Sequence, residues 1–173
     1  MHPAVARLTE LMPPPSSGGV PVDWDAAVEQ WGNELPTDYR EFIELYGGGS
    51  INRSFHFSAP SVVGYSPRQA IDLVQATELG FELFDAEDED ALAEAEGRIC
   101  WAVDAGANHA YWDTADADPE RWTVLVLKKY GEWVPFDCGM AQFMVHLLTG
   151  GIDPQPMALF DPETPEFHPW KRA

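Results

Sequence analysis

The stretch LPTDYREFIELYGGGSIN, residues 35–52, holds the point at which the chain changes from a helix pattern to a strand pattern. Pro36 disfavours helical backbone at Leu35, and Thr37 then stands where an N-cap is expected. One apolar helix face follows, formed by Tyr39, Phe42, Ile43 and Tyr46. Gly47 comes next, at the position where a glycine with positive φ commonly ends a helix. We therefore predict a helix between Pro36 and Gly47.

The residues after the three glycines alternate as they do in a strand. Ile51, Phe55 and Phe57 share one face of a strand predicted over residues 50–57, and Arg53 interrupts the regular pattern. The glycines lack G-x-G-x-x-G spacing, and no Lys-Ser or Lys-Thr pair follows them. We interpret them as a hinge between helix and sheet, not as a phosphate-binding loop.

Two helices are predicted before this stretch. The first spans residues 4–12 and ends in the linker PPPSSGG. The second begins after Asp23 as its N-cap and ends at Gly32. Its apolar side chains are expected to be buried, and they are Trp24, Ala27, Val28 and Trp31.

Two more helices are predicted in the second part of the chain. One starts after Ser66 with Pro67 in its first turn, and its buried face is expected to consist of Ala70, Ile71, Val74 and Leu79. The other follows Asp137 as its N-cap and ends at Gly150. The apolar face of this closing helix consists of Met140, Phe143, Met144, Leu147 and Leu148.

Four short runs between residues 98 and 137 are rich in β-branched and aromatic residues. They are RICWAVDAG, HAYWDT, WTVLVLKKYG and EWVPFD. Turn-forming residues separate them, so we predict an antiparallel meander. Helices, then strands, then a helix are typical of an α+β fold with a central, mainly antiparallel sheet and helices packed against it.

The length of 173 residues fits one domain with one core. We predict that the domain spans residues 22–150. Residues 1–21 form an N-terminal helix and a linker before it, and residues 151–173 form a Pro-rich tail after it. The tail is expected to be extended and to lie across the domain through its aromatic residues.

Acidic residues dominate the charge of the chain. Lys and Arg number 10 against 29 Asp and Glu, which gives a formal net charge of −19 at pH 7. Such a field repels nucleic acid and anionic lipid and attracts basic proteins. We therefore expect no direct binding of nucleic acid or membrane. The acidity could also serve solubility alone.

Two acidic segments are candidates for a partner-binding surface. The first lies between residues 85 and 96 and contains Asp85, Glu87, Asp88, Glu89, Asp90, Glu94 and Glu96. The second consists of Asp113, Asp116, Asp118 and Glu120. The first segment has no basic residue, so it can equally be a solvated, solubilising loop.

The chain shows no sign of export or of membrane insertion. Cys100 and Cys138 are its two cysteines, which is no disulfide framework. Its N-terminus lacks an apolar run of signal-peptide length, and no run of about 18 apolar residues occurs. These features favour a cytoplasmic location.

Catalytic and metal-binding patterns are weak. The five histidines show no H-E-x-x-H motif and no shared helix face, so we expect no metal site and no cofactor. Cys138 lies near a helix start, which could lower its pKa, but the sequence offers it no base. His109 and Asp113 form the one pair worth checking for a shared pocket, and a surface turn is the alternative.

The quoted stretch, the strand pair RICWAVDAGANHAYWDT, the strand TVLVLK and the helix start FDCGMAQFMVHLL together resemble the SMI1/KNR4 family of the SUKH superfamily. The resemblance covers roughly residues 22–149. It implies a binding protein and not an enzyme. Bacterial members of the family act as immunity proteins against toxins, many of them nucleases, and fungal members act as interaction hubs in cell-wall signalling.

The resemblance implies that the partner is a protein, and the charge favours a basic toxin domain. Aromatic anchors would supply much of the affinity, and Trp112 and Trp133 are the candidates, with core packing as the alternative for each. Two other functions stay open: a stand-alone regulatory or scaffold protein of the same fold, and a hydrolase that uses Cys138 or His109. The sequence leaves the oligomeric state open.

Overall fold

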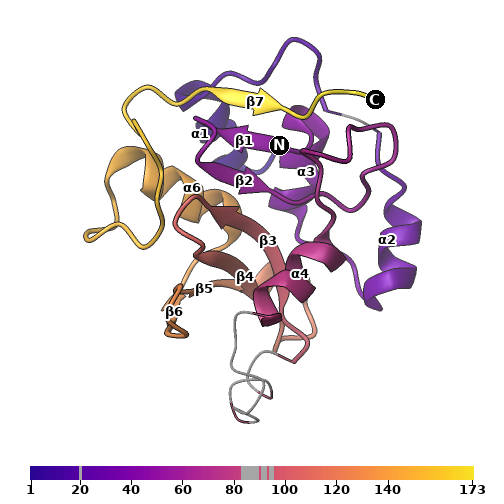
Figure 1. Ribbon diagram of the computed structural model, residues 1–173, viewed down its shortest axis with the longest axis vertical. Helices are drawn as coiled ribbons and strands as arrows, with labels where there is room; N and C mark the ends of the chain where they lie inside the picture. Colours follow the sequence, from indigo (N-terminus) through magenta and orange to yellow (C-terminus); the bar gives the residue numbers. More distant parts are fainter. Residues whose placement is uncertain (20, 83–89, 91–92, 94–95) are drawn as a thin grey trace.

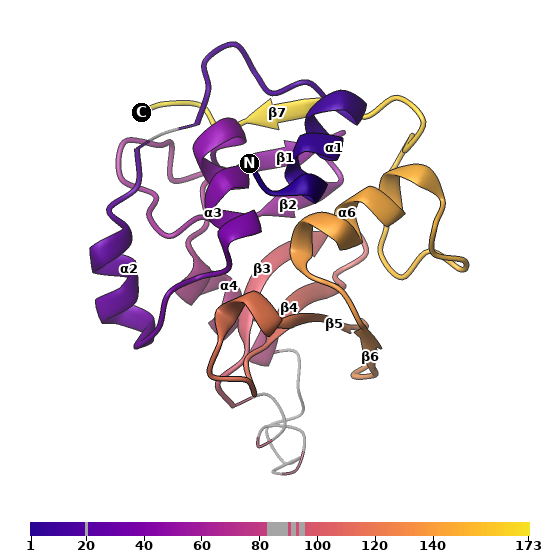
Figure 2. The ribbon, with the colours of Figure 1, turned by 180° about the vertical axis from the view of Figure 1, so that it is seen from behind.

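The computed structural model describes residues 1–19, 21–82, 90, 93 and 96–173. Within these residues, seven strands form one sheet in the order β6-β5-β4-β3-β2-β1-β7, and every neighbouring pair is antiparallel. Helices cover both faces of this sheet (Figures 1 and 2). The α+β fold with a central antiparallel sheet is thus confirmed.

The helix expected in the stretch 35–52 is α3, Thr37–Tyr46. Gly47 ends it with a φ of 75°, as predicted. The predicted capping role of Thr37 is wrong, because Thr37 is the first helical residue and its side chain donates to Glu120. Pro36 occupies the N-cap position and offers no side-chain hydrogen bond.

The single strand predicted over residues 50–57 is a hairpin of two strands, β1 (Gly49–Ile51) and β2 (Phe55–Phe57). Asn52 and Arg53 both have positive φ, 48° and 53°, as in a type I′ turn. Ile51 pairs directly with Phe55, so the two side chains share a face across the hairpin. That pairing mimics continuous alternation, which is why the turn was missed.

The predicted meander is confirmed. Its strands are β3 (Ile99–Asp104), β4 (His109–Asp113), β5 (Thr123–Leu127) and β6 (Trp133–Phe136). A short 3-10 helix, η1 (Pro119–Arg121), lies between β4 and β5. The expectation of an extended tail is only partly right, because bends and a turn interrupt residues 152–164; the tail then adds a strand, β7 (Phe167–Pro169), which pairs with β1.

Three helices cover one face of the sheet: α1 (Pro3–Leu11), α3 and α6 (Met140–Thr149). The main core fills this layer, and it includes residues from the N-terminal helix and the tail, such as Val5 and Phe167. The two end segments are therefore packed parts of the folded body. Val5, Leu8 and Met12 are fully buried.

The opposite face carries α4 (Leu73–Glu82), which packs on the β3–β5 half of the sheet (Figure 1). A second, smaller core lies beneath it and consists of Ala76, Cys100, Tyr111, Leu125 and Leu127. α4 begins later than predicted, because the Asp72 side chain accepts from the amide of Gln75, as in a capping box. Leu79 is 48% exposed, so its predicted burial is wrong, and the other residues predicted to be buried are only half-buried: Ala70, Ile71 and Val74.

Another helix, α2 (Trp24–Trp31), begins and ends as predicted. The Asp23 side chain accepts from the amide of Ala26, and Gly32 has a φ of 71°. Its predicted burial is only partly right, since Ala27 is buried but Trp24, Val28 and Trp31 are only half-buried. α2 lies at the edge of the body, where Trp24 contacts Arg40 and Glu44 of α3.

The closing helix α6 has the predicted apolar face and ends at Gly150, whose φ is 71°. The predicted N-cap, Asp137, is wrong. Gly139 stands at the N-cap position, and Asp38 of α3 accepts the hydrogen bond from the amide of Ala141 at 2.8 Å. A buried carboxylate more than a hundred residues away in the chain therefore caps this helix.

Both outer strands of the sheet carry a proline, Pro135 in β6 and Pro169 in β7. Proline has no N–H group to donate, so these edges are poor templates for pairing with another chain. None of the helices in the described ranges has both the length and the apolar character needed to cross a bilayer.

Candidate functional site

The first acidic segment falls largely outside the described residues. Asp85, Glu87, Asp88, Glu89 and Glu94 belong to that part of the chain. Two of its carboxylates are described, Asp90 and Glu96, and both residues are exposed. Their role as a partner surface stays a prediction.

The second acidic segment is the connection from β4 to β5, and its carboxylates organise the local backbone. Asp113 accepts from the amide of Ala115, and Asp116 accepts from the amide of Asp118. Asp118 in turn caps η1 by accepting from the amide of Glu120. The conformation of the turn is thus held by hydrogen bonds to its own carboxylates, which give it a negative charge.

Glu120 ties this acidic turn to the body of the protein. Its carboxylate accepts from the backbone N–H and the hydroxyl of Thr37, at 2.8 and 2.7 Å. Asp116 forms an ion pair with Arg121 at 3.3 Å, so part of its charge is balanced. Asp113, Asp118 and Glu120 remain at least partly exposed around it.

Trp112 cannot anchor a partner in this conformation, so its prediction as a contact residue is corrected. Its side chain is 0% exposed, and its ring meets Tyr39 edge-on at 4.8 Å between centroids. Trp112 lies on β4 and faces the main core, where an apolar side chain of this size is most stabilising. Trp112 is therefore a core residue, which was the alternative given for it.

Trp133 lies on the outer strand β6 and is half-buried. Its ring packs edge-on against Tyr111 at 5.1 Å, and the guanidinium of Arg98 sits over it at 4.4 Å. Trp133 therefore keeps some exposed surface at the edge of the small core. Of the two predicted anchors, it is the one that a partner can reach.

The candidate catalytic groups do not converge. His109 and Asp113 stand at the two ends of β4, about 13 Å apart at the rise of a strand. Burial lowers the pKa of His109. Burial and the nearby Asp137 and Asp38 raise the pKa of Cys138, whereas the position near a helix start had favoured a lowered pKa.

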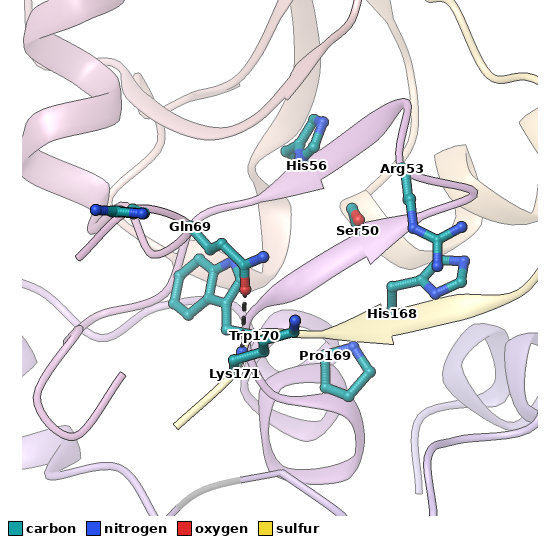
Figure 3. A pocket seen from close by; sticks show the side chains of 9 residues that line it. Ser50, Arg53, His56, Gln69, His168, Pro169, Trp170 and Lys171 are labelled. Atoms are coloured by element: carbon teal, nitrogen blue, oxygen red, sulfur yellow. Dashed lines mark hydrogen bonds between the residues drawn. The ribbon is translucent and has the colours of Figure 1, made fainter. Parts of the chain in front are cut away.

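The half of the sheet that α4 leaves uncovered is hollowed into a pocket of about 420 Å³ (Figure 3). The register of β2, β1 and β7 places His56, Ser50 and His168 side by side in one transverse row, because Ser50 pairs with both histidines. The main core on the other face of the sheet contains the side chains of Ile51, Phe55, Phe57 and Phe167, which flank the row along the strands. Polar side chains are therefore left on the open face.

Three cations surround this row: Arg53 from the β1–β2 turn, Arg68 from the loop before α4, and Lys171 from the tail. Arg53 extends toward the ring of His168, and Gln69 accepts from the amide of Lys171 (Figure 3). Among the described residues, no carboxylate lines the pocket and none forms an ion pair with these three cations. Trp170 and Pro169 supply an apolar wall.

This basic pocket was not predicted from the sequence. Its residues come from the hairpin, the loop before α4 and the tail, so no local motif connects them. Arg53 was the one available signal, because it interrupted the alternation of the strand. The pocket continues past His56, Arg68 and Gln69 into a second hollow along α4, whose far end carries Glu78 and Glu82.

The family-model comparison matched the SMI1-KNR4 cell-wall model over residues 23–139, more than half of the chain. This chain belongs to the SMI1/KNR4 family of the SUKH superfamily. Comparisons with curated proteins and with solved structures each found no match.

The SMI1/KNR4 match runs from the N-cap of α2 to the N-cap position of α6. Three packed elements lie outside it: α1, α6 and β7. One of the contacts that join the matched region to α6 is the hydrogen bond from the amide of Ala141 to Asp38. The SMI1/KNR4 region of this chain is thus completed by segments on both sides.

Proposed function

We propose that this SMI1/KNR4 protein is a non-catalytic immunity protein that binds and neutralises a basic toxin domain. The observation that carries the proposal is membership of a family that includes immunity proteins, in a chain with a net charge of −19. A nuclease toxin must present positive charge to hold phosphates, and a carboxylate-rich protein can compete for that surface.

The acidic turn from Asp113 to Glu120 is the proposed contact surface within the described chain. Hydrogen bonds fix its carboxylates to the backbone, so little side-chain entropy remains to be lost on binding. Rim charges of this kind chiefly raise the association rate, while a few buried contacts dominate the affinity. Trp133 is the proposed aromatic contact. Asp90 and Glu96 extend the acidic surface in the same proposal.

Two features support a non-catalytic role over a hydrolase. The thiol of Cys138 has a raised pKa, so a smaller fraction is the nucleophilic thiolate at neutral pH. His109 and Asp113 are too far apart for one to orient the other. The SMI1/KNR4 resemblance points in the same direction.

The proposal is tested by co-expression with a toxin encoded beside this gene. We expect the full chain to restore growth of cells that produce the toxin, and to co-purify with it. The variant D113N/D116N/D118N/E120Q replaces the four carboxylates of the acidic turn with neutral amides. Its association rate with the toxin should be lower by about tenfold at low salt. Amides accept the same hydrogen bonds, so the turn should stay folded.

The matched control neutralises four exposed carboxylates outside both acidic segments, D25N/E29Q/D153N/E163Q. It removes the same charge and should leave the association rate nearer to that of the wild type. An equal loss in both variants would assign the effect to overall charge. Failure of rescue, together with the absence of a toxin gene nearby, would contradict the immunity proposal and favour the stand-alone regulatory or scaffold protein.

A further inference from the structure

We propose that the basic pocket between β2, β1, β7 and the loop before α4 binds a small phosphorylated molecule, with Arg53, Arg68 and Lys171 as the source of positive charge around it. This proposal does not depend on the toxin partner. The pocket is lined by positive charge and lies in a different part of the molecule from the acidic turn.

The concentration of positive charge in the pocket is the first argument. The whole chain contains 10 Lys and Arg, and three of them line this one hollow. Elsewhere in the described chain, Arg7, Arg40 and Arg121 form ion pairs with carboxylates. Arg53, Arg68 and Lys171 form no ion pair with any carboxylate that the structure describes, so their charges are available to an anion.

The donor set is the second argument. Two guanidinium groups and one ammonium group complement the charge of a phosphoryl group, and a guanidinium group binds phosphate through paired N–H donors. The hydroxyl of Ser50 lies between His56 and His168 at the base of the pocket, and each can add a donor. Gln69 uses its carbonyl oxygen on Lys171, which leaves its amide N–H₂ for a ligand.

The net charge of −19 does not prevent this binding. Screening limits the field of exposed charges to about 8 Å at physiological salt, so the groups that line the pocket dominate its local potential. Glu166 carries a carboxylate close to the row, 3.8 Å from the Nε2 of His168. Glu166 does not line the pocket, and its side chain is 76% exposed. A long polyanion would still be repelled beyond the pocket, which favours a small ligand.

The size of the pocket is the third argument. Its volume of about 420 Å³ falls within the range of small-molecule sites and exceeds what one phosphate ion fills. The ring of Trp170 and the ring of Pro169 form an apolar wall beside the cations. A phosphorylated molecule with an organic part would use both the charged and the apolar sides.

The test titrates the full, ¹⁵N-labelled chain with inorganic phosphate and with pyrophosphate at constant ionic strength. We expect saturable shifts in the amide signals of Ser50, Gln69 and Lys171, with pyrophosphate binding more tightly than phosphate. Acetate and a short Asp-rich peptide are the carboxylate probes. Tighter binding of either one, or no saturable shift with phosphate or pyrophosphate, would overturn the proposal.

The test variant is R53N/R68Q. Asn tolerates the positive φ at position 53, so the type I′ turn should be kept, and Arg68 lies in an exposed loop. We expect pyrophosphate affinity to fall by about tenfold or more. The control R7Q/K129Q removes the same charge from exposed sites outside the pocket and should change the affinity by less than about twofold. Equal loss in both variants would contradict a specific site.

Discussion

Gly48 shows how one residue can depend on a segment far away in the chain. A Cβ atom at this position would overlap the ring of Trp170, and one at Gly49 would lie 2.5 Å from the carbonyl oxygen of His168. Gly47 is needed for its positive φ, but the other two glycines are needed because the tail crosses them closely. The glycine run therefore ends the helix at Gly47, and the tail packs closely against Gly48 and Gly49.

The variant G48A should destabilise the protein by about 1–3 kcal/mol, because the added methyl group forces Trp170 from its place. Urea unfolding measures this change. In a W170A background the same substitution should be less destabilising, since the ring that it would displace is gone. Additive effects of the two substitutions would contradict the contact.

Asp38 links stability to pH. Burial raises the pKa of its carboxyl above the ordinary value of 3.8, although the amide of Ala141 opposes this by hydrogen bonding. The folded chain therefore holds this proton more tightly than the unfolded chain. The resulting stabilisation is complete below the unfolded-state pKa and is lost as pH rises through the folded-state pKa.

The variant D38N does not titrate at this position, and its amide oxygen can still accept from Ala141. We expect the free energy of unfolding of the wild type, relative to D38N, to decrease between pH 3 and pH 7. Urea midpoints measured across this range give the slope. A relative stability that rises with pH would mean that the hydrogen bonds outweigh burial.

At the scale of elements, the strand β7 forms one edge of the sheet beside β1, and its Phe167 belongs to the aromatic cluster of the main core. Phe167 meets Tyr46 edge-on at 5.1 Å and Phe42 at 5.9 Å. Asn52 of the hairpin turn also binds the tail, since its side chain accepts from the amide of Glu166 and donates to the carbonyl of Phe160. The tail is thus held by a strand, a ring cluster and a turn.

Phe167 and Phe160 offer a matched pair for testing this docking, because one is 6% exposed and the other 57% exposed. F167A should lower the free energy of unfolding by about 3–5 kcal/mol, as for a core aromatic. F160A should change it by no more than about 0.5 kcal/mol. Calorimetric melting of both variants checks this. Similar melting temperatures would show that β7 adds little to stability.

At the scale of the whole molecule, the charge of −19 is a source of self-repulsion in the folded state. Added salt screens this repulsion, so the Tm should rise between about 10 and 150 mM NaCl. The variant D113N/D116N/D118N/E120Q carries fewer negative charges and should show a weaker rise. A Tm that falls with salt in the wild type would show that favourable ion pairs dominate.

Local patterns in the sequence were enough to predict most of the elements. The face formed by Tyr39, Phe42 and Tyr46, the four strands of the meander and the glycines that end α2, α3 and α6 are all correct. Each depends on residues within one turn or one strand, where periodicity and backbone preference act directly. The turn at Asn52 and Arg53 was missed because its two strands share one apolar face.

Long-range features needed the packed chain. The cap of α6 comes from Asp38, the reason for Gly48 is Trp170, and the basic pocket joins Arg53, Arg68 and Lys171 from three segments. The spacing of neighbouring residues in the sequence does not predict such contacts, because they form only when the tail pairs with β1 and the helices cover the sheet. Composition and short-range pattern thus specified the acidic character and the α+β elements, whereas sites made of distant residues follow from how those elements pack.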